Sequence, residues 1–184
     1  MARVRYVARE DLPESQHHIY DEIADSRGIR AIGNGFEALL NSPEAAAHIG
    51  TLGAYLRFQS ELPATTRELV TIAVAQELGC DYEQTHHERL ARKAGVSDAS
   101  IATIREGKAP DGLLQDEATV VRYAQELLRH HHVTEDMFDT VLKQLGTRGL
   151  IDLTLLVGYY AMLAMAFLAL NVELEEGLIP RPDR

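Results

Sequence analysis

The stretch RELVTIAVAQELGCDYEQTHHERLARKAG, residues 67–95, decides the fold because it reads as two helices joined by a tight turn. Pro63 breaks the chain shortly before it. Gly79 is placed to end the first helix, Asp81 can cap the second, and Gly95 is placed to stop it. The segment therefore predicts a helical hairpin, with its chemistry-bearing side chains gathered near the turn.

Helical periodicity continues on both sides of this hairpin, and strand-like alternation is almost absent. We expect an all-α fold of one domain, without linkers, low-complexity tracts or internal boundaries. Further helices are expected over about 14–25, 43–60, 97–107, 116–132 and 134–145, followed by a long apolar helix.

The last of these helices contains LTLLVGYYAMLAMAFLAL, residues 153–170, with no charge over 18 positions. A run of this length is also a transmembrane candidate. Glutamates rather than Lys or Arg follow it, and no second run of this length exists. We therefore expect a buried helix, in the core or at a subunit interface, with a membrane anchor as the alternative.

Composition narrows the class of protein. The chain has 184 residues, 46% apolar, with 18 basic against 28 acidic side chains and a net charge of -10. These values exclude a disordered chain and disfavour nucleic acid and anionic membranes as partners. Cys80 is the single cysteine, and the N-terminus has no apolar stretch of the secretory type. A reducing, cytoplasmic setting is expected.

Reactive side chains concentrate at the hairpin turn. Cys80 precedes a helix N-terminus, where the macrodipole favours a thiolate. Glu83 and His87 are four residues apart and share one face of that helix. Glu68 lies on the preceding helix, which folds back against the next one. The spacing predicts that thiol, imidazole and carboxylates converge on one site.

Each residue also has a structural interpretation. Glu68 could be only the carboxylate of a capping box with Thr65, Cys80 a small buried hydrophobe, and Glu83 a first-turn acid. Metal binding is not expected, because one thiol is too few and the consecutive His130–His132 diverge on a helix. No cofactor is expected.

At these residues the sequence resembles the carboxymuconolactone decarboxylase-like and alkyl hydroperoxidase D-like families. The resemblance spans about residues 36–171, and it divides the chain into an N-terminal extension (1–35), a helical domain (36–171) and a tail (172–184). It implies an all-α multi-helix domain built around the hairpin and assembled into homotrimers or homohexamers. It also implies a small-molecule substrate, with no nucleic acid or membrane as partner.

The two branches of the family differ at one position. The peroxidase branch has a glutamate, a C-x-x-C pair and a histidine, and here Glu68, Cys80 and His87 occupy three of these positions. Glu83 stands where the second cysteine belongs, so no disulfide can close the peroxidase cycle. The decarboxylase branch has Tyr-Glu-Trp followed by histidine, and here the sequence is Tyr82-Glu83-Gln84.

Three functions follow from this resemblance. The first is proton-relay chemistry on a small carboxylated lactone or related acid, with His87 and Glu83 or Glu68 as acid and base. The second is a single-cysteine peroxidase that uses Cys80, and the third is a non-catalytic helical oligomer. Further residues near the motif are candidates for substrate binding: Tyr82, His86 and Arg67, with Arg89 and Arg92 as other cations.

Overall fold

The computed structural model describes residues 1–178, and within that range the chain forms α-helices and short 3-10 turns but no strand. The all-α prediction is confirmed. Part of the predicted tail, residues 179–184, lies outside the described range. In chain order the helices are α1 His17–Asp25, α2 Gly33–Leu39, α3 Pro43–Phe58, α4 Ala64–Leu78, α5 Asp81–Ala94, α6 Asp98–Arg105, α7 Gln115–His130 and α8 Glu135–Leu170.

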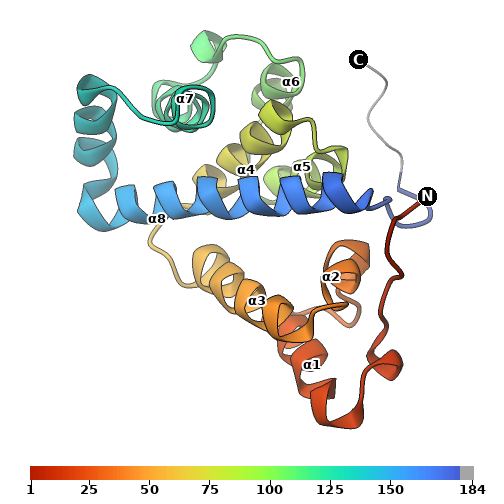
Figure 1. The fold of residues 1–184 in the computed structure, drawn as a ribbon. Helices are drawn as coiled ribbons and strands as arrows, with labels where there is room; N and C mark the ends of the chain where they lie inside the picture. Colours follow the sequence, from red (N-terminus) through yellow and green to blue (C-terminus); the bar gives the residue numbers. More distant parts are fainter. Residues whose placement is uncertain (179–184) are drawn as a thin grey trace.

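Helix α8 runs through the middle of the molecule, with α4 to α7 on one side and α1 to α3 on the other (Figure 1). Its buried face joins α3, α4 and α7 in the largest apolar core, which includes Leu56, Val74 and Leu156. A second core ties α1 to α3 and the N-terminal segment, which includes Val7. Any cavity between these two layers therefore has walls from distant parts of the sequence.

The predicted hairpin is formed by α4 and α5. Both helices end at a glycine in the left-handed region, Gly79 (φ 70°) and Gly95 (φ 95°), as predicted. Two predicted details are wrong. Cys80, not Asp81, occupies the position that precedes α5, and α4 begins one residue after Pro63 without the expected capping box. The side chain of Glu68 is thus free to make a tertiary contact.

The long helix α8 is bent rather than straight. Gly146 has φ 69° and ψ 175°, which interrupts the helix where the sequence predicted an end. Beyond this bend, Leu153 and Leu156 are completely buried. Among residues 1–178 this is the one helix long and apolar enough to cross a membrane, and half of its most apolar window is buried within the fold. The buried half of this window packs in the main apolar core, so α8 is the central helix of the fold.

The N-terminal segment returns to the end of α8 (Figure 1). The backbone N–H of Arg3 donates to the carbonyl of Leu170 at 2.9 Å, and the terminal amine of Met1 pairs with Glu173 at 3.0 Å. The chain after α8 is thereby held against the N-terminal layer.

Candidate active site

His87 lies between two carboxylates. Its Nδ1 is 2.7 Å from Oε2 of Glu68, and its Nε2 is 3.2 Å from Oε2 of Glu83. All three side chains are buried, and they come from α4 and from successive turns of α5. The predicted convergence of Glu68, Glu83 and His87 is what the structure shows.

Attraction between the His87 imidazole and the neighbouring carboxylates offsets the cost of burying these groups. Burial alone would lower the pKa of His87, but the adjacent Glu68 and Glu83 raise it above its ordinary value. Burial would raise the pKa of Glu68, but the charge and the hydrogen bond of His87 lower it. Both shifts favour a protonated imidazole beside an ionised Glu68. Glu68, His87 and Glu83 thus form a line of groups that could serve as a proton relay.

Cys80 does not have the properties of a reactive thiol. Its side chain is only 2% exposed and packs in the main apolar core. Burial raises the pKa of the thiol to about 12, although the backbone N–H groups of Glu83 and Tyr82 oppose that effect. The expectation of an activated thiolate at the start of α5 is not met, because desolvation outweighs the helix dipole.

A cavity of about 690 Å³ opens beside His87, between α5, α8 and the N-terminal layer. Glu83, His87 and Tyr160 line it, whereas Glu68 and Cys80 do not. Glu68 is therefore the rear member of the relay, and Glu83 and His87 are the members that a bound molecule could touch. The ring of Tyr160 packs edge-on against His87 at 4.8 Å between centroids.

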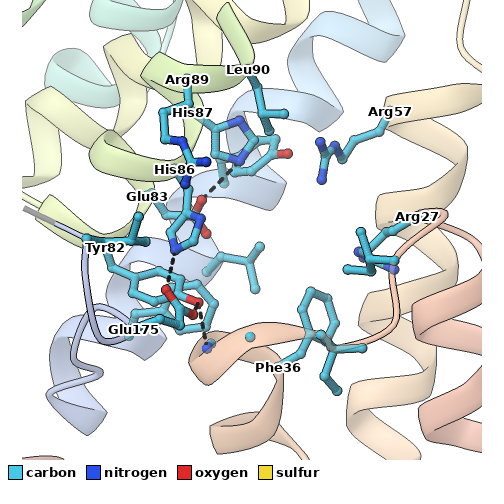
Figure 2. A pocket seen from close by; sticks show the side chains of 18 of the residues that line it. Arg27, Phe36, Arg57, Tyr82, Glu83, His86, His87, Arg89, Leu90 and Glu175 are labelled. Carbon is cyan, nitrogen blue, oxygen red and sulfur yellow. Dashed lines mark hydrogen bonds and ion pairs between the residues drawn. The ribbon is translucent and has the colours of Figure 1, made fainter. Parts of the chain in front are cut away.

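Two arginines face this relay across the cavity, Arg27 after α1 and Arg57 in the last turn of α3 (Figure 2). Sequence reasoning missed both, because neither belongs to the hairpin: Arg27 follows α1, and Arg57 lies on α3. Of the three cations proposed from the sequence, one lines the cavity and two do not. Arg67 donates to the carbonyl of Leu62 and Arg92 pairs with Asp98, and neither lines the cavity, whereas Arg89 does.

The segment after α8 contributes Glu175 to the lining of the cavity (Figure 2). The Tyr82 hydroxyl donates to Oε1 of Glu175 at 2.8 Å, the backbone N–H of Asn34 donates to the same oxygen at 2.8 Å, and His86 Nε2 lies 2.8 Å from Oε2. Tyr82 and His86, predicted as substrate-binding residues, thus line the cavity and also hold this strap, residues 173–178.

The strap should be sensitive to acid. Burial would raise the pKa of Glu175, but hydrogen bonds from His86, Tyr82 and Asn34 lower it to about 2. A lowered pKa contributes stability that is complete above the ordinary value and lost as the pH falls towards 2. We expect Glu175→Gln to cost about 1 kcal/mol at neutral pH, because solvent screens the half-exposed carboxylate.

The measurement is denaturant unfolding of the wild type and Glu175→Gln at neutral and at acidic pH. The difference in free energy of unfolding should shrink as Glu175 of the wild type protonates. Glu176→Gln is the matched control, since Glu176 is the exposed neighbour and takes part in no ion pair within residues 1–178. An equal loss in both variants would contradict the role of Glu175.

No group of three or more His, Cys, Asp and Glu side chains suited to a metal ion occurs within residues 1–178. His130 and His132 lie near each other at the end of α7, with ring centroids 6.2 Å apart, but His131 has a left-handed backbone and turns away from the helix.

Comparison with known proteins agrees with this fold. Residues 43–126, which include the hairpin, match the model of the Carboxymuconolactone decarboxylase family, so the resemblance seen in the sequence is confirmed for this segment. No curated protein matches the chain significantly.

Solved structures show the same fold at low sequence identity. An alkylhydroperoxidase AhpD core protein, an uncharacterized peroxidase-related protein from Ralstonia eutropha JMP134, is 14% identical with a TM-score of 0.79, covering 98% of both chains. A peroxidase-related protein from Silicibacter sp. TM1040 is 16% identical with a TM-score of 0.78, covering 96% of this chain and 93% of that one. The debrominase Bmp8 is 17% identical with a TM-score of 0.75, covering 94% and 92%.

Proposed function

We propose that the protein is an enzyme that transfers protons on a small carboxylated molecule, in the manner of the decarboxylase branch of the family it resembles. The observation that carries the proposal is the position of His87, held between Glu68 and Glu83 with only His87 and Glu83 facing the cavity. Such a line of groups can pass a proton between the interior and a bound molecule.

A balanced reaction can be written for this site. The bond to the departing carboxylate breaks, CO₂ leaves, and the electron pair moves into a conjugated carbonyl of the substrate to form an enolate. Glu83 or His87 then protonates the carbon, and Glu68 keeps the imidazole oriented. The reaction consumes one proton, which solvent returns to the relay after release of the product.

In this proposal the hydroxyl of Tyr160 stabilises the enolate. This hydroxyl makes no hydrogen bond to any other residue among 1–178, although the side chain is buried and lines the cavity. Burial raises the pKa of this hydroxyl well above its ordinary value, so the hydroxyl stays protonated and can donate. A donor preorganised for developing negative charge lowers the barrier of such a reaction.

A turnover assay tests the proposal. The wild type and Glu83→Gln are incubated in D₂O with carboxymuconolactone and with a series of β-keto acids, and CO₂ release and deuterium incorporation are measured. We expect the wild type to release CO₂ and to place one deuterium at the vacated carbon, while Glu83→Gln does so at least about 100-fold more slowly. Equal rates in the two proteins would overturn the relay.

The alternative is a single-cysteine peroxidase, which the peroxidase-related names of two structural neighbours suggest. The burial of Cys80 and its absence from the cavity argue against it. A pKa of about 12 leaves on the order of 1 thiol in 10⁴ ionised at pH 8.

The debrominase Bmp8, a variant of which was solved in complex with 2,3,4-tribromopyrrole, supports a small ring as the kind of molecule this fold can hold.

We therefore expect Cys80 to resist oxidation. Intact mass is measured after brief exposure of the reduced protein to a stoichiometric organic hydroperoxide between about pH 6 and 9, with Cys80→Ser as control. The wild type should gain no oxygen beyond that seen in the control, and the same thiol should react after unfolding in denaturant. Rapid addition of one oxygen to the folded wild type would favour the peroxidase.

The protein is also expected to form a homo-oligomer, as the family resemblance implies. One face of α8 exposes large apolar side chains, among them Ile151 (49%), Leu155 (46%) and Met165 (57%). A continuous apolar face of this kind is typical of a surface that is covered by another subunit. Light scattering should give a mass of three or six chains, and Met165→Glu should lower it; a wild-type monomer would contradict the proposal.

A further inference from the structure

Arg27 and Arg57 are half-buried in the wall of the cavity and form no ion pair within residues 1–178. Six arginines in other parts of the described chain form ion pairs with a carboxylate: Arg9, Arg92, Arg105, Arg122, Arg129 and Arg148. Within residues 1–178, Arg27 and Arg57 form none, as is also true of Arg3, Arg5, Arg30, Arg67 and Arg89. Of these unpaired arginines, Arg27 and Arg57 are the ones that are both half-buried and part of the cavity lining, since Arg89 is exposed. Two half-buried guanidinium groups without a counter-ion therefore share one cavity.

Both groups are held in place by neutral contacts. Arg27 Nη1 donates to the carbonyl of Ile23 at 3.0 Å, and its guanidinium lies 4.4 Å above the ring of Phe36. A Cβ on Gly53 would lie 2.2 Å from the hydroxyl of Tyr159 and 3.2 Å from Nη2 of Arg27, so glycine makes room for this pair. The guanidinium of Arg57 lies 5.2 Å from the ring of Phe58.

Such contacts orient the two cations, and no carboxylate of the described residues lies within ion-pair distance of either. Burial acts to lower the pKa of Arg57, but Tyr160 and the charges of Glu68 and Glu83 raise it overall. Burial lowers the pKa of Arg27, which reflects the cost of holding a desolvated cation that lacks a counter-ion. A planar guanidinium also presents paired donors that match the two oxygens of a carboxylate. A ligand that brings a carboxylate would compensate both charges at once.

The remaining walls indicate what the carboxylate is attached to. Between the arginines and the relay the cavity is lined mainly by apolar and aromatic side chains: Ile29, Ile32, Phe36, Leu163 and Phe167. Figure 2 shows Arg27 and Arg57 on one side of this space and Glu83, His87 and Tyr82 on the other. A molecule that reaches both sides has an anionic end and an apolar body.

We propose that Arg27 and Arg57 form the carboxylate-binding subsite of this cavity, and that the substrate is an organic acid with an apolar ring or chain between that carboxylate and the reacting carbon. The part of this inference that concerns the reacting carbon rests on the proposed function, whereas the binding of the carboxylate does not. The two guanidinium groups stabilise the carboxylate they bind and so oppose its loss. The bound acid is thus a group that the product retains, and a different carbon reacts at Glu83 and His87.

Equilibrium binding of a matched pair of probes tests the subsite without any turnover. The probes are 4-phenylbutyrate and the neutral 4-phenylbutyramide, titrated by calorimetry into the wild type, Arg27→Gln, Arg57→Gln and the control Arg30→Gln. Arg30 is exposed, lies close to Arg27 in sequence and does not line the cavity. Circular dichroism and thermal unfolding show whether each variant is folded.

We expect the wild type to bind the acid about 10-fold to 100-fold more tightly than the amide. Each cavity variant should reduce this ratio by about tenfold or more, whereas Arg30→Gln should keep the wild-type ratio. In the wild type, the affinity for the acid should fall with added salt while the affinity for the amide stays constant. Because the salt series uses only the wild type, it tests the subsite even if an arginine variant does not fold.

Equal affinities of the wild type for acid and amide would overturn the subsite, as would an unchanged ratio in both cavity variants. Failure of the acid to bind at about 10 mM would overturn it as well. A failure of the proposed chemistry gives a different result: the acid then binds with the expected preference, but no substrate releases CO₂ or takes up deuterium.

Discussion

Replacing His87 with glutamine is expected to lower kcat by about 10²–10⁴-fold on the substrate that the turnover assay identifies. His87 connects Glu68 at 2.7 Å with Glu83 at 3.2 Å, and an amide in its place cannot pass a proton between them. KM should change little, because the proposed anchoring cations lie on the opposite wall of the cavity.

His48→Gln is the control for this substitution. His48 is exposed on α3 and does not line the cavity. Its loss should leave kcat within about tenfold of the wild type. If His87→Gln retained full activity, or if both variants lost activity equally, His87 would not be the centre of the relay.

The same substitution changes how stability depends on pH. The pKa of His87 is raised by Glu68 and Glu83 against its burial, so the charged imidazole stabilises the fold fully below its ordinary pKa. That contribution disappears as the pH rises through the raised value. Denaturant unfolding should therefore show a larger difference between wild type and His87→Gln near pH 6 than near pH 10.

Replacing Leu156 with alanine is expected to lower the free energy of unfolding by about 2–5 kcal/mol. Leu156 is completely buried on α8 and packs in the main core with residues of α3, α4 and α7. Removing its branched side chain leaves a cavity at the position where both layers of the molecule meet the central helix. Equilibrium denaturation followed by circular dichroism measures the loss.

The control for this prediction is Leu114→Ala, since Leu114 is 73% exposed. That change should alter the free energy of unfolding by no more than about 0.5 kcal/mol. A similar effect of the two substitutions would mean that α8 is not the structural centre of the fold.

The sequence was most informative where structure depends on local rules. The ends of the hairpin helices at Gly79 and Gly95 were predicted because glycine adopts the left-handed conformation at little cost. The pairing of Glu83 with His87 followed from a spacing of four residues on one helix. Both depend only on neighbouring positions in the chain.

Local rules failed where a tertiary contact competed with them. The capping box with Thr65 did not form, because the carboxylate of Glu68 contacts His87, nineteen residues away. The dipole argument for Cys80 considered one helix end and could not include the core that buries the thiol. Burial depends on the whole fold, so the helix alone led to the wrong expectation for the thiol.

The cavity itself was beyond sequence reasoning. Arg27 and Arg57 belong to different elements, and no periodicity relates them to the motif at residues 67–95. Glu175 lies in the tail, where the sequence has no helical pattern. Only long-range packing brings these three side chains to the site of Glu83 and His87, and the resemblance to the family did not name them.

The two walls of the cavity have largely different origins in the chain. The proposed reacting groups come from the hairpin α4 and α5. On the opposite wall Arg57 lies within the matched family region at residues 43–126, while Arg27, Ile32 and Phe36 come from a segment that precedes it. Mutations in that segment can alter which molecules are accepted and leave the acid and base untouched. Selection, in nature or in a laboratory library, can therefore change the specificity of such a protein through its first forty residues while its chemistry is inherited intact.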